Sequence, residues 1–203
     1  MPAGWVLTSA TCSDGSPPSA IALSALETVT CTFVNQRQTG AIKIIKTRKH
    51  AADGPGPHPH AGVTFTVAGG SLAAPVQVVT AADGTACLSG MLLSSFVGGY
   101  TVTETVPAGY VPDGALTKDV SVVQASTCGD GREATVTFSN TPLTNVTVSV
   151  DSIVPGGTAS TMTCTRSNGA VVGAGATGAG GDGSLTLPNL VPDVYTCTIN
   201  VDP

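Results

Sequence analysis

A lysine closes an apolar stretch near the start of the central part of the chain. Ile42, Ile44 and Lys46 alternate with other residues after Gly40. Alternation along a β-strand puts these three side chains on one face, while Lys43 points to the other. A lysine among core residues needs a partner, because its ammonium group loses its hydration on burial. The pattern therefore predicts a strand whose inward face ends in a buried amine, which is a nucleophile when neutral.

The six cysteines form a second set of residues with chemistry of their own. They are far apart and include no Cys-x-x-Cys pair, so they resemble neither zinc ligands nor a thioredoxin-type redox site. An even number of cysteines in a turn-rich β protein favours structural disulfides and an extracellular location. The alternative is buried free thiols in a cytosolic protein. The cysteines are Cys12, Cys31, Cys87, Cys128, Cys164 and Cys197.

Three histidines, His50, His58 and His60, flank a proline-rich segment. A His-x-His pair with a nearby aspartate could bind a metal ion. The segment offers no rigid scaffold and no evident fourth ligand, so we expect a solvated loop instead. The sequence predicts no metal site and no cofactor.

The composition favours small β domains and excludes several function classes. A chain of 203 residues with 25 Gly, 14 Pro and 10% charged residues has room for about two domains. Short alternating Val- and Thr-rich runs between turns predict antiparallel β-sandwiches. The net charge of −5 with scattered basic residues provides no footprint for nucleic acid. No apolar run reaches the length of about 18 residues that a membrane-spanning helix needs, and an export signal would lie outside this chain.

The two ends of the chain repeat different parts of its middle. Phe33 follows Gly4 at the same spacing at which Phe138 follows Gly109. The matched residues are Trp5 with Tyr110, Phe33 with Phe138, Asn35 with Asn140, Tyr195 with Tyr100, and Val146, Val148 and Val150 with Ile42, Ile44 and Lys46. We therefore predict a complete domain over residues 40–141. Residues 1–39 form the C-terminal part, and residues 142–203 the N-terminal part, of a second, split domain.

Four motifs of the central domain carry a family resemblance. They span residues 40–46, 61–67, 99–110 and 136–142. In this order they resemble the Cna B-type, or SpaA-like, prealbumin-fold domains of bacterial surface proteins and pili. The resemblance implies prealbumin-like sandwiches. Together with the composition and the repeat, it predicts an all-β fold of tandem Ig-like or prealbumin-like antiparallel β-sandwiches, one complete and one split between the two chain ends.

The same resemblance implies an intramolecular isopeptide bond between Lys46 and Asn140, with Glu104 as the assisting acid. Burial disfavours the charged forms of both the amine and the carboxyl group, so a neutral lysine and a protonated glutamic acid can coexist. Lys46 Nζ would then attack the side-chain carbonyl carbon of Asn140. The alternative is a buried ion pair between Lys46 and Glu104 without any reaction.

The split domain lacks this set, because Val150 stands in place of Lys46 and Ile199 in place of Glu104. Disulfides would replace the isopeptide bond as its cross-links. Its four cysteines allow three connectivities, and pairs between the two pieces would join neighbouring subunits covalently. We expect the pairs Cys12–Cys31, Cys164–Cys197 and, in the central domain, Cys87–Cys128.

These features together predict a non-enzymatic structural protein of the cell surface. The end pieces of successive copies would complete one sandwich head-to-tail, giving an open filament, pilus-like fibre or adhesin stalk. Alternatively, the chain is one period of a longer tandem-repeat protein. A monomeric surface module that binds carbohydrate or host matrix is the second function considered, although few aromatic residues are available for it. No nucleophile, base and acid set suggests a hydrolase.

Two local expectations complete the interpretation. The glycine-rich segment from Gly173 to Gly181 has little to bury and is expected to be a mobile surface loop. Trp5 is expected to fill a core position, as its counterpart Tyr110 does.

Overall fold

The computed structural model describes residues 4–49, 54–153 and 159–201, in which all elements but one are β-strands. In chain order these are β1 (Trp5–Cys12), β2 (Cys31–Arg37), β3 (Thr39–Lys49), β4 (Pro57–Pro59), β5 (Thr64–Gly69), β6 (Val76–Val79), β7 (Thr85–Leu92), α1 (Ser94–Val97), β8 (Tyr100–Glu104), β9 (Tyr110–Pro112), β10 (Thr117–Val120), β11 (Ala134–Pro142), β12 (Thr144–Val150), β13 (Ser160–Arg166), β14 (Val171–Ala176), β15 (Gly183–Leu190) and β16 (Tyr195–Val201). The predicted all-β class is confirmed. Within these ranges, no helix has the length and hydropathy to cross a membrane.

The chain divides into two compact units. One comprises residues 1–46, 59–105 and 115–138, and the other comprises residues 47–58, 106–114 and 139–203. The division passes through β3 and β11, so each of these strands contributes residues to both units.

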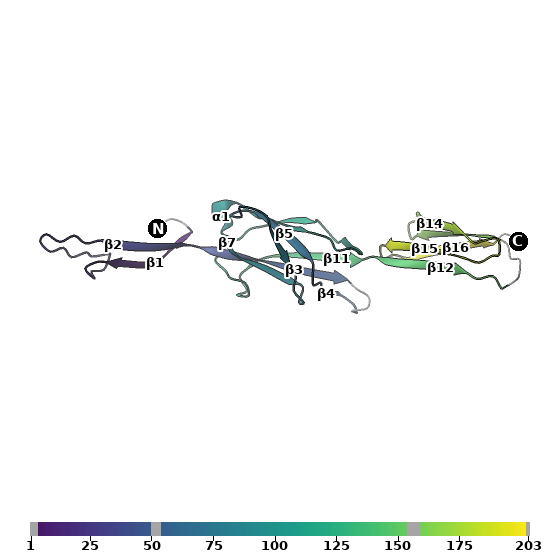
Figure 1. Ribbon diagram of the computed structural model, residues 1–203, viewed down its shortest axis with the longest axis horizontal. Coiled ribbons are helices and arrows are strands. Elements are labelled where there is room, and N and C mark those ends of the chain that lie inside the picture. Colours follow the sequence, from purple (N-terminus) through teal and green to yellow (C-terminus); the bar gives the residue numbers. More distant parts are fainter. Residues whose placement is uncertain (1–3, 50–53, 154–158, 202–203) are drawn as a thin grey trace. The chain divides into compact units, whose positions relative to one another are not determined.

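Two sheets supply the strands of the central region (Figure 1). A four-stranded sheet has the order β10-β8-β5-β6, and a five-stranded sheet contains β4-β3-β11-β9 with β7 paired to β3. Alternate residues of each strand share a face, so each sheet presents an apolar side. One buried cluster joins the two sheets, and its largest members include Ile42, Ile44, Phe65, Val67, Tyr100, Val102 and Phe138. The rings of Phe65 and Phe138 lie 4.9 Å apart between centroids.

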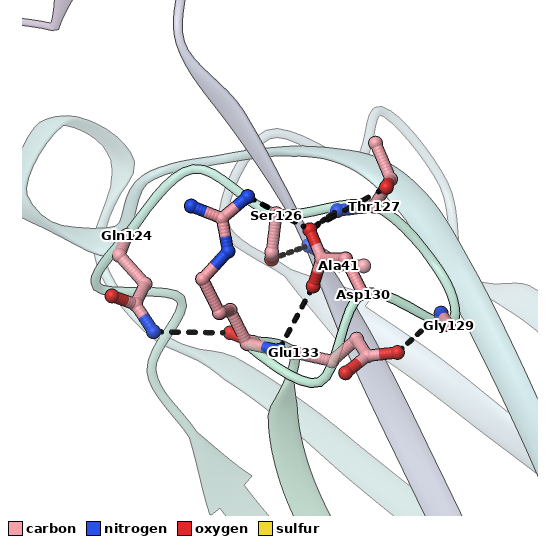
Figure 2. Close-up of polar contacts among 8 residues, drawn as sticks. Ala41, Gln124, Ser126, Thr127, Gly129, Asp130 and Glu133 are labelled. Atoms are coloured by element: carbon pink, nitrogen blue, oxygen red, sulfur yellow. Dashed lines mark hydrogen bonds and ion pairs between the residues drawn. The ribbon is translucent and has the colours of Figure 1, made fainter.

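The loop between β10 and β11 is held by its own polar contacts (Figure 2) and by the Cys87–Cys128 disulfide. The Asp130 carboxylate accepts hydrogen bonds from the backbone N–H groups of Thr127 and Arg132, at 2.7 and 2.8 Å. Ser126 Oγ accepts a hydrogen bond of 2.9 Å from the Ala41 N–H of β3. This last hydrogen bond attaches the loop to β3.

Residues 5–37 form an antiparallel hairpin of β1 and β2. Within the described residues, these two strands make a sheet of their own. Its large apolar side chains are exposed, including Leu7 at 43% and Phe33 at 55%. Large apolar side chains typically stabilise a fold by about 1.5–3 kcal/mol each when fully buried. The exposed side chains of this hairpin do not contribute this free energy.

Residues 144–201 form two small sheets, β12-β15 and β14-β13-β16. Their buried apolar side chains are Met162, Cys164 and Leu187, with exposures of 0%, 0% and 7%. In β12, Val146, Val148 and Val150 are only half-buried. The core of this region is therefore much smaller than that of the central sheets.

The glycine-rich segment corrects one sequence-based expectation. Residues predicted as a mobile loop instead begin within the strand β14, which pairs with β13 from Thr161 to Thr165. A Cβ atom on Gly173 would overlap the Leu187 side chain, and one on Gly175 would contact Leu185 at 3.4 Å. Glycine is used here because the neighbouring sheet packs directly on the strand backbone.

A glycine next to Lys46 should be sensitive to substitution. Gly84 has a φ of +74°, and an added Cβ would lie 2.5 Å from the Lys46 carbonyl oxygen. We expect Gly84→Ala to lower the free energy of unfolding by about 2–4 kcal/mol, from backbone strain and a backbone clash. Gly90, with a φ of +79° and no atom within 4 Å of its Cβ position, is the matched control. Chemical denaturation measures both, and equal losses in Gly84→Ala and Gly90→Ala would contradict the clash.

Candidate functional site

The Lys46 backbone is fixed on both sides. Its N–H donates to the Gly84 carbonyl at 2.8 Å, and its carbonyl accepts from the His60 N–H at 3.0 Å. The side chain is fully buried, on the same face of β3 as Ile42 and Ile44. The structure therefore confirms the prediction that the Lys46 side chain points inward.

Glu104 ends β8 and points into the same core. It lies opposite Phe65 in the β5–β8 ladder, and its N–H donates to the Leu116 carbonyl at 2.8 Å. Its Oε1 is 3.0 Å from Lys46 Nζ, with side-chain exposures of 1% and 0%. The structure thus brings two of the three predicted reactive residues together in a site that excludes water.

Asn140 lies in β11, which is next to β3 in the order of the five-stranded sheet. The residue is fully buried. In the ladder with β9, Asn140 is opposite Pro112. The third predicted residue therefore occupies an inward position on the strand adjacent to that of Lys46.

A carboxylate that sequence reasoning missed fixes the residues on both sides of Asn140. Asp113 accepts hydrogen bonds from Ser139 Oγ at 2.7 Å and from Thr141 Oγ1 at 2.6 Å. Lys49 Nζ lies 3.4 Å from the same carboxylate. Alternation in β11 could have placed Ser139 and Thr141 opposite to Asn140, but nothing in the sequence indicates that Asp113 would reach both.

The pKa of Asp113 reflects this setting. Desolvation by burial raises the pKa of Asp113, but the hydroxyl groups of Thr141 and Ser139 and the charge of Lys49 together hold it below its ordinary value. The ionised carboxylate is therefore the form that stabilises this end of β11.

The six cysteines form the three expected pairs, Cys12–Cys31, Cys87–Cys128 and Cys164–Cys197. Cys12–Cys31 links β1 to β2, and Cys164–Cys197 links β13 to β16, each between directly opposite residues. Each terminal piece therefore has a cross-link of its own. Disulfides of this kind typically contribute about 2–4 kcal/mol.

His60 departs from the solvated loop that the sequence predicts. His60 is buried, with an exposure of 7%, and its carbonyl accepts a hydrogen bond from Thr80 Oγ1 at 2.7 Å. His58 Nε2 is 3.2 Å from the Gly54 carbonyl, whereas His50 is outside the described residues. Packing of the chain between β4 and β5 against Lys46 buries His60. Across residues 4–49, 54–153 and 159–201, no three potential metal ligands are grouped.

The N-terminal hairpin repeats the ladder of β9 and β11 residue for residue. Trp5 pairs with Arg37 and Leu7 with Asn35, as Tyr110 pairs with Pro142 and Pro112 with Asn140. A further hydrogen bond of 2.7 Å recurs as well, from Gln38 N–H to the Gly4 carbonyl and from Leu143 N–H to the Gly109 carbonyl. Both parts of the chain therefore have the same local structure.

The same residues differ greatly in exposure. Phe138 is 3% exposed in β11, whereas its counterpart Phe33 is 55% exposed in β2. Trp5, expected in a core, is 38% exposed, and Arg37 stacks over its ring at 5.5 Å. Phe138 packs against Phe65 of the other central sheet, whereas β1 and β2 form a sheet of their own among the described strands.

Residues 144–201 repeat the first part of the central region in the same way. Met162 is opposite Ile199 and Cys164 is opposite Cys197, matching the pairs Phe65–Glu104 and Val67–Val102. The β12–β15 ladder reproduces the β3–β7 ladder, and both ladders contain a bulge at the same place. The bulge follows the pair Thr144–Leu190 in the first ladder and the pair Gly40–Met91 in the second. The structure thus aligns Val150 with Lys46 and Ile199 with Glu104.

Comparisons with known proteins found likenesses in structure only. No family model and no curated protein sequence matches the chain. The Bacillus anthracis TIE protein matches 87% of this chain and 31% of its own length, with 22% identity and a TM-score of 0.46. The minor pilin GBS52 of Streptococcus agalactiae matches 63% of this chain, with 18% identity and a TM-score of 0.39. The major pilin SpaD of Corynebacterium diphtheriae matches 75%, with 18% identity and a TM-score of 0.42.

The chain spans 56% of the length of each of these two pilins. At such TM-scores the likeness by itself supports neither a family nor a function. What the chain does must therefore be argued from its own contacts.

Replacing the carboxylate beside Asn140 should produce a pH-dependent effect. Because the pKa of Asp113 is lowered in the folded protein, its stabilisation is present above the ordinary pKa and is lost as the pH falls through the folded-state value. Asp113→Asn should lower the free energy of unfolding by about 1 kcal/mol at pH 7 and by much less near pH 2. Urea unfolding at both pH values measures this. The exposed Asp119→Asn serves as a charge-matched control, and an equal loss at both pH values would contradict the assignment.

Proposed function

We propose that the chain is a structural repeat of an extracellular filament or surface stalk. An isopeptide bond between Lys46 and Asn140 hardens its central region. Residues 142–203 of one copy and residues 1–39 of the next build one shared sandwich. The next copy is either a separate molecule or a neighbouring repeat of the same polypeptide. The repeated register of the terminal pieces, together with their exposed core positions, gives this proposal its main support.

The cross-linking reaction needs only the three buried residues. Lys46 Nζ attacks Asn140 Cγ, the Nζ–Cγ bond forms, and the Cγ–Nδ2 bond breaks. Protonated Glu104 gives its proton to the departing Asn140 nitrogen, which leaves as ammonia, and takes one proton from Lys46 Nζ, so the acid is neutral before and after the reaction. No oxidant, metal or cofactor is consumed. The contact of 3.0 Å between Lys46 Nζ and Glu104 Oε1 is suited to this proton transfer.

The unreacted alternative is less favourable physically. A buried ion pair loses several kcal/mol of hydration per ion, and its attraction offsets this only with excellent geometry and further hydrogen bonds. An amide and a neutral carboxylic acid carry no charge to desolvate. Burial of Lys46 and Glu104 therefore favours the bonded product once Asn140 is within reach.

The mass of the protein tests the cross-link. Under reducing and denaturing conditions, the chain should be lighter than its sequence mass by one ammonia. Glu104→Gln should restore the full mass, because the side chain can no longer relay protons. Asn140→Ala should likewise show no deficit against its own sequence mass. Lys43→Arg, on the outward face of the same strand, should keep the deficit. A full sequence mass in the unaltered protein would contradict the bond.

The shared sandwich predicts a second reactive site that can be restored by substitution. Val150 and Ile199 align with Lys46 and Glu104, and the exposed Asn35 aligns with Asn140. Val150→Lys combined with Ile199→Glu should therefore bond one copy to Asn35 of the next. We expect a ladder of multiples on a reducing denaturing gel.

The matched control is the same double variant with Asn35→Ala, which keeps both new charges but removes the acceptor. It should run as a monomer. A double variant that remains monomeric at high concentration would contradict the shared sandwich while leaving the central cross-link unaffected.

A further inference from the structure

The strand β16 lacks a neighbour that its counterpart has. In the central region β8 lies between β5 and β10, whereas β16 is an edge strand of the sheet β14-β13-β16 in the described part of the chain. The two strands are otherwise equivalent: Tyr195 Oη donates to the Val191 carbonyl at 2.6 Å, as Tyr100 Oη donates to the Leu92 carbonyl at 2.8 Å. Among the described strands, none takes the position beside β16 that β10 has beside β8.

The inward face of β16 shows the effect of this missing neighbour. Tyr100 and Val102 are fully buried in β8, while the equivalent Tyr195 and Cys197 are only half-buried. Farther along the strand, Ile199 is 40% exposed, although its counterpart Glu104 is 4% exposed. An additional strand along this edge would cover that apolar face.

A segment suited to this edge lies between β1 and β2. Ile21 and Leu23 alternate with alanines and are 47% and 69% exposed, and residues 20–23 belong to no strand. The segment is part of the loop closed by the Cys12–Cys31 disulfide. Its place in the chain, between β1 and β2, corresponds to that of β10 between β9 and β11.

We infer that residues 20–23 of a second copy pair antiparallel with the free edge of β16, as β10 pairs with β8. This inference rests on the proposed shared sandwich, in which β2 of one copy and β12 of another would be neighbours as their counterparts β11 and β3 are. It adds a second strand contact to that pairing. In the central ladder Lys118 is opposite Val102 and Val120 is opposite Tyr100. Residues 12–15 stand at the ungapped spacing of β10, but they belong to β1 and the turn after it. We therefore use the next apolar pair of the loop, which puts Ile21 opposite Cys197 and Leu23 opposite Tyr195 of the other copy.

This register places both branched apolar side chains on the inward face. Val120 is 8% exposed and Tyr100 is fully buried, so paired residues at these positions face the core. Ile21 and Leu23 would therefore cover the Cys164–Cys197 disulfide and Tyr195, while Ala20 and Ala22 face solvent. We choose a second copy as the partner because the proposed contact has the same form as the β8–β10 ladder within this chain.

Substitutions in the loop between β1 and β2 can distinguish this contact from non-specific hydrophobic association. In the full chain, Ile21→Asp and Leu23→Asp should each weaken the self-association constant about tenfold or more, since each would put a charge on the buried face. Leu26→Asp is the matched control, because Leu26 is fully exposed at 107% and lies beyond the proposed strand. It should change the constant less than twofold. Sedimentation over a concentration series measures the self-association constant of all three variants. Each variant should still fold, because the substituted side chains are exposed.

Hydrogen exchange supplies a second readout. On association, the β16 amides should become protected, and Leu23→Asp should abolish this protection. If Leu26→Asp weakens association as much as Leu23→Asp, or if association proceeds without added protection of β16, this strand contact is wrong. In that event a covalent ladder from the Val150→Lys and Ile199→Glu variant would still uphold the shared sandwich. Absence of both association and ladder would overturn the two together.

Discussion

The contact between a buried lysine and a buried glutamate in the central core is the interaction on which the proposed cross-link depends. Lys46 Nζ and Glu104 Oε1 are 3.0 Å apart at side chains with 0% and 1% exposure. Charges held at that depth lose most of their hydration, which is why such pairs are weak sources of stability. Forming an amide with Asn140 removes the amine charge and leaves a neutral acid. Gly84 and His60 fix the Lys46 backbone, and Asp113 fixes the residues beside Asn140, an arrangement that would suit the proposed reaction.

The proposed bond also explains why these strands, and not others, carry the reactive residues. Lys46 is in β3 and Asn140 in β11, the strands by which the chain enters and leaves the central region. Tension applied through the flanking pieces would reach these two strands first. With a covalent link between β3 and β11, the tension would pass through chemical bonds. The hydrogen-bonded ladders and the core would then not have to resist it. In the terminal pieces, the disulfides Cys12–Cys31 and Cys164–Cys197 instead cross-link each piece separately, which would suit the proposed assembly of two pre-formed halves.

The sequence predicted the features that depend on local period and spacing. Alternation placed Lys46 among core residues, and equal spacings aligned Phe33 with Phe138 and Tyr195 with Tyr100, pairs whose ladders coincide in the structure. The sequence-based predictions failed where contacts with distant parts of the chain determine the local structure. Composition made Gly173 look like loop, but Leu187 of another strand requires a residue without a side chain there. Likewise, burial of His60 and the double contact of Asp113 depend on segments far away in the chain, which no local pattern records.

Covalent connectivity between Lys46 and Asn140 is the central claim, and peptide mapping tests it most directly. After reduction, alkylation and proteolysis, tandem mass spectrometry should find one branched peptide in which the segment containing Lys46 is joined to that containing Asn140. Its mass should equal the sum of the two linear peptides less one ammonia, and fragmentation should locate the junction at these two residues. Recovery of both linear peptides at full mass, with no branched species, would contradict the account.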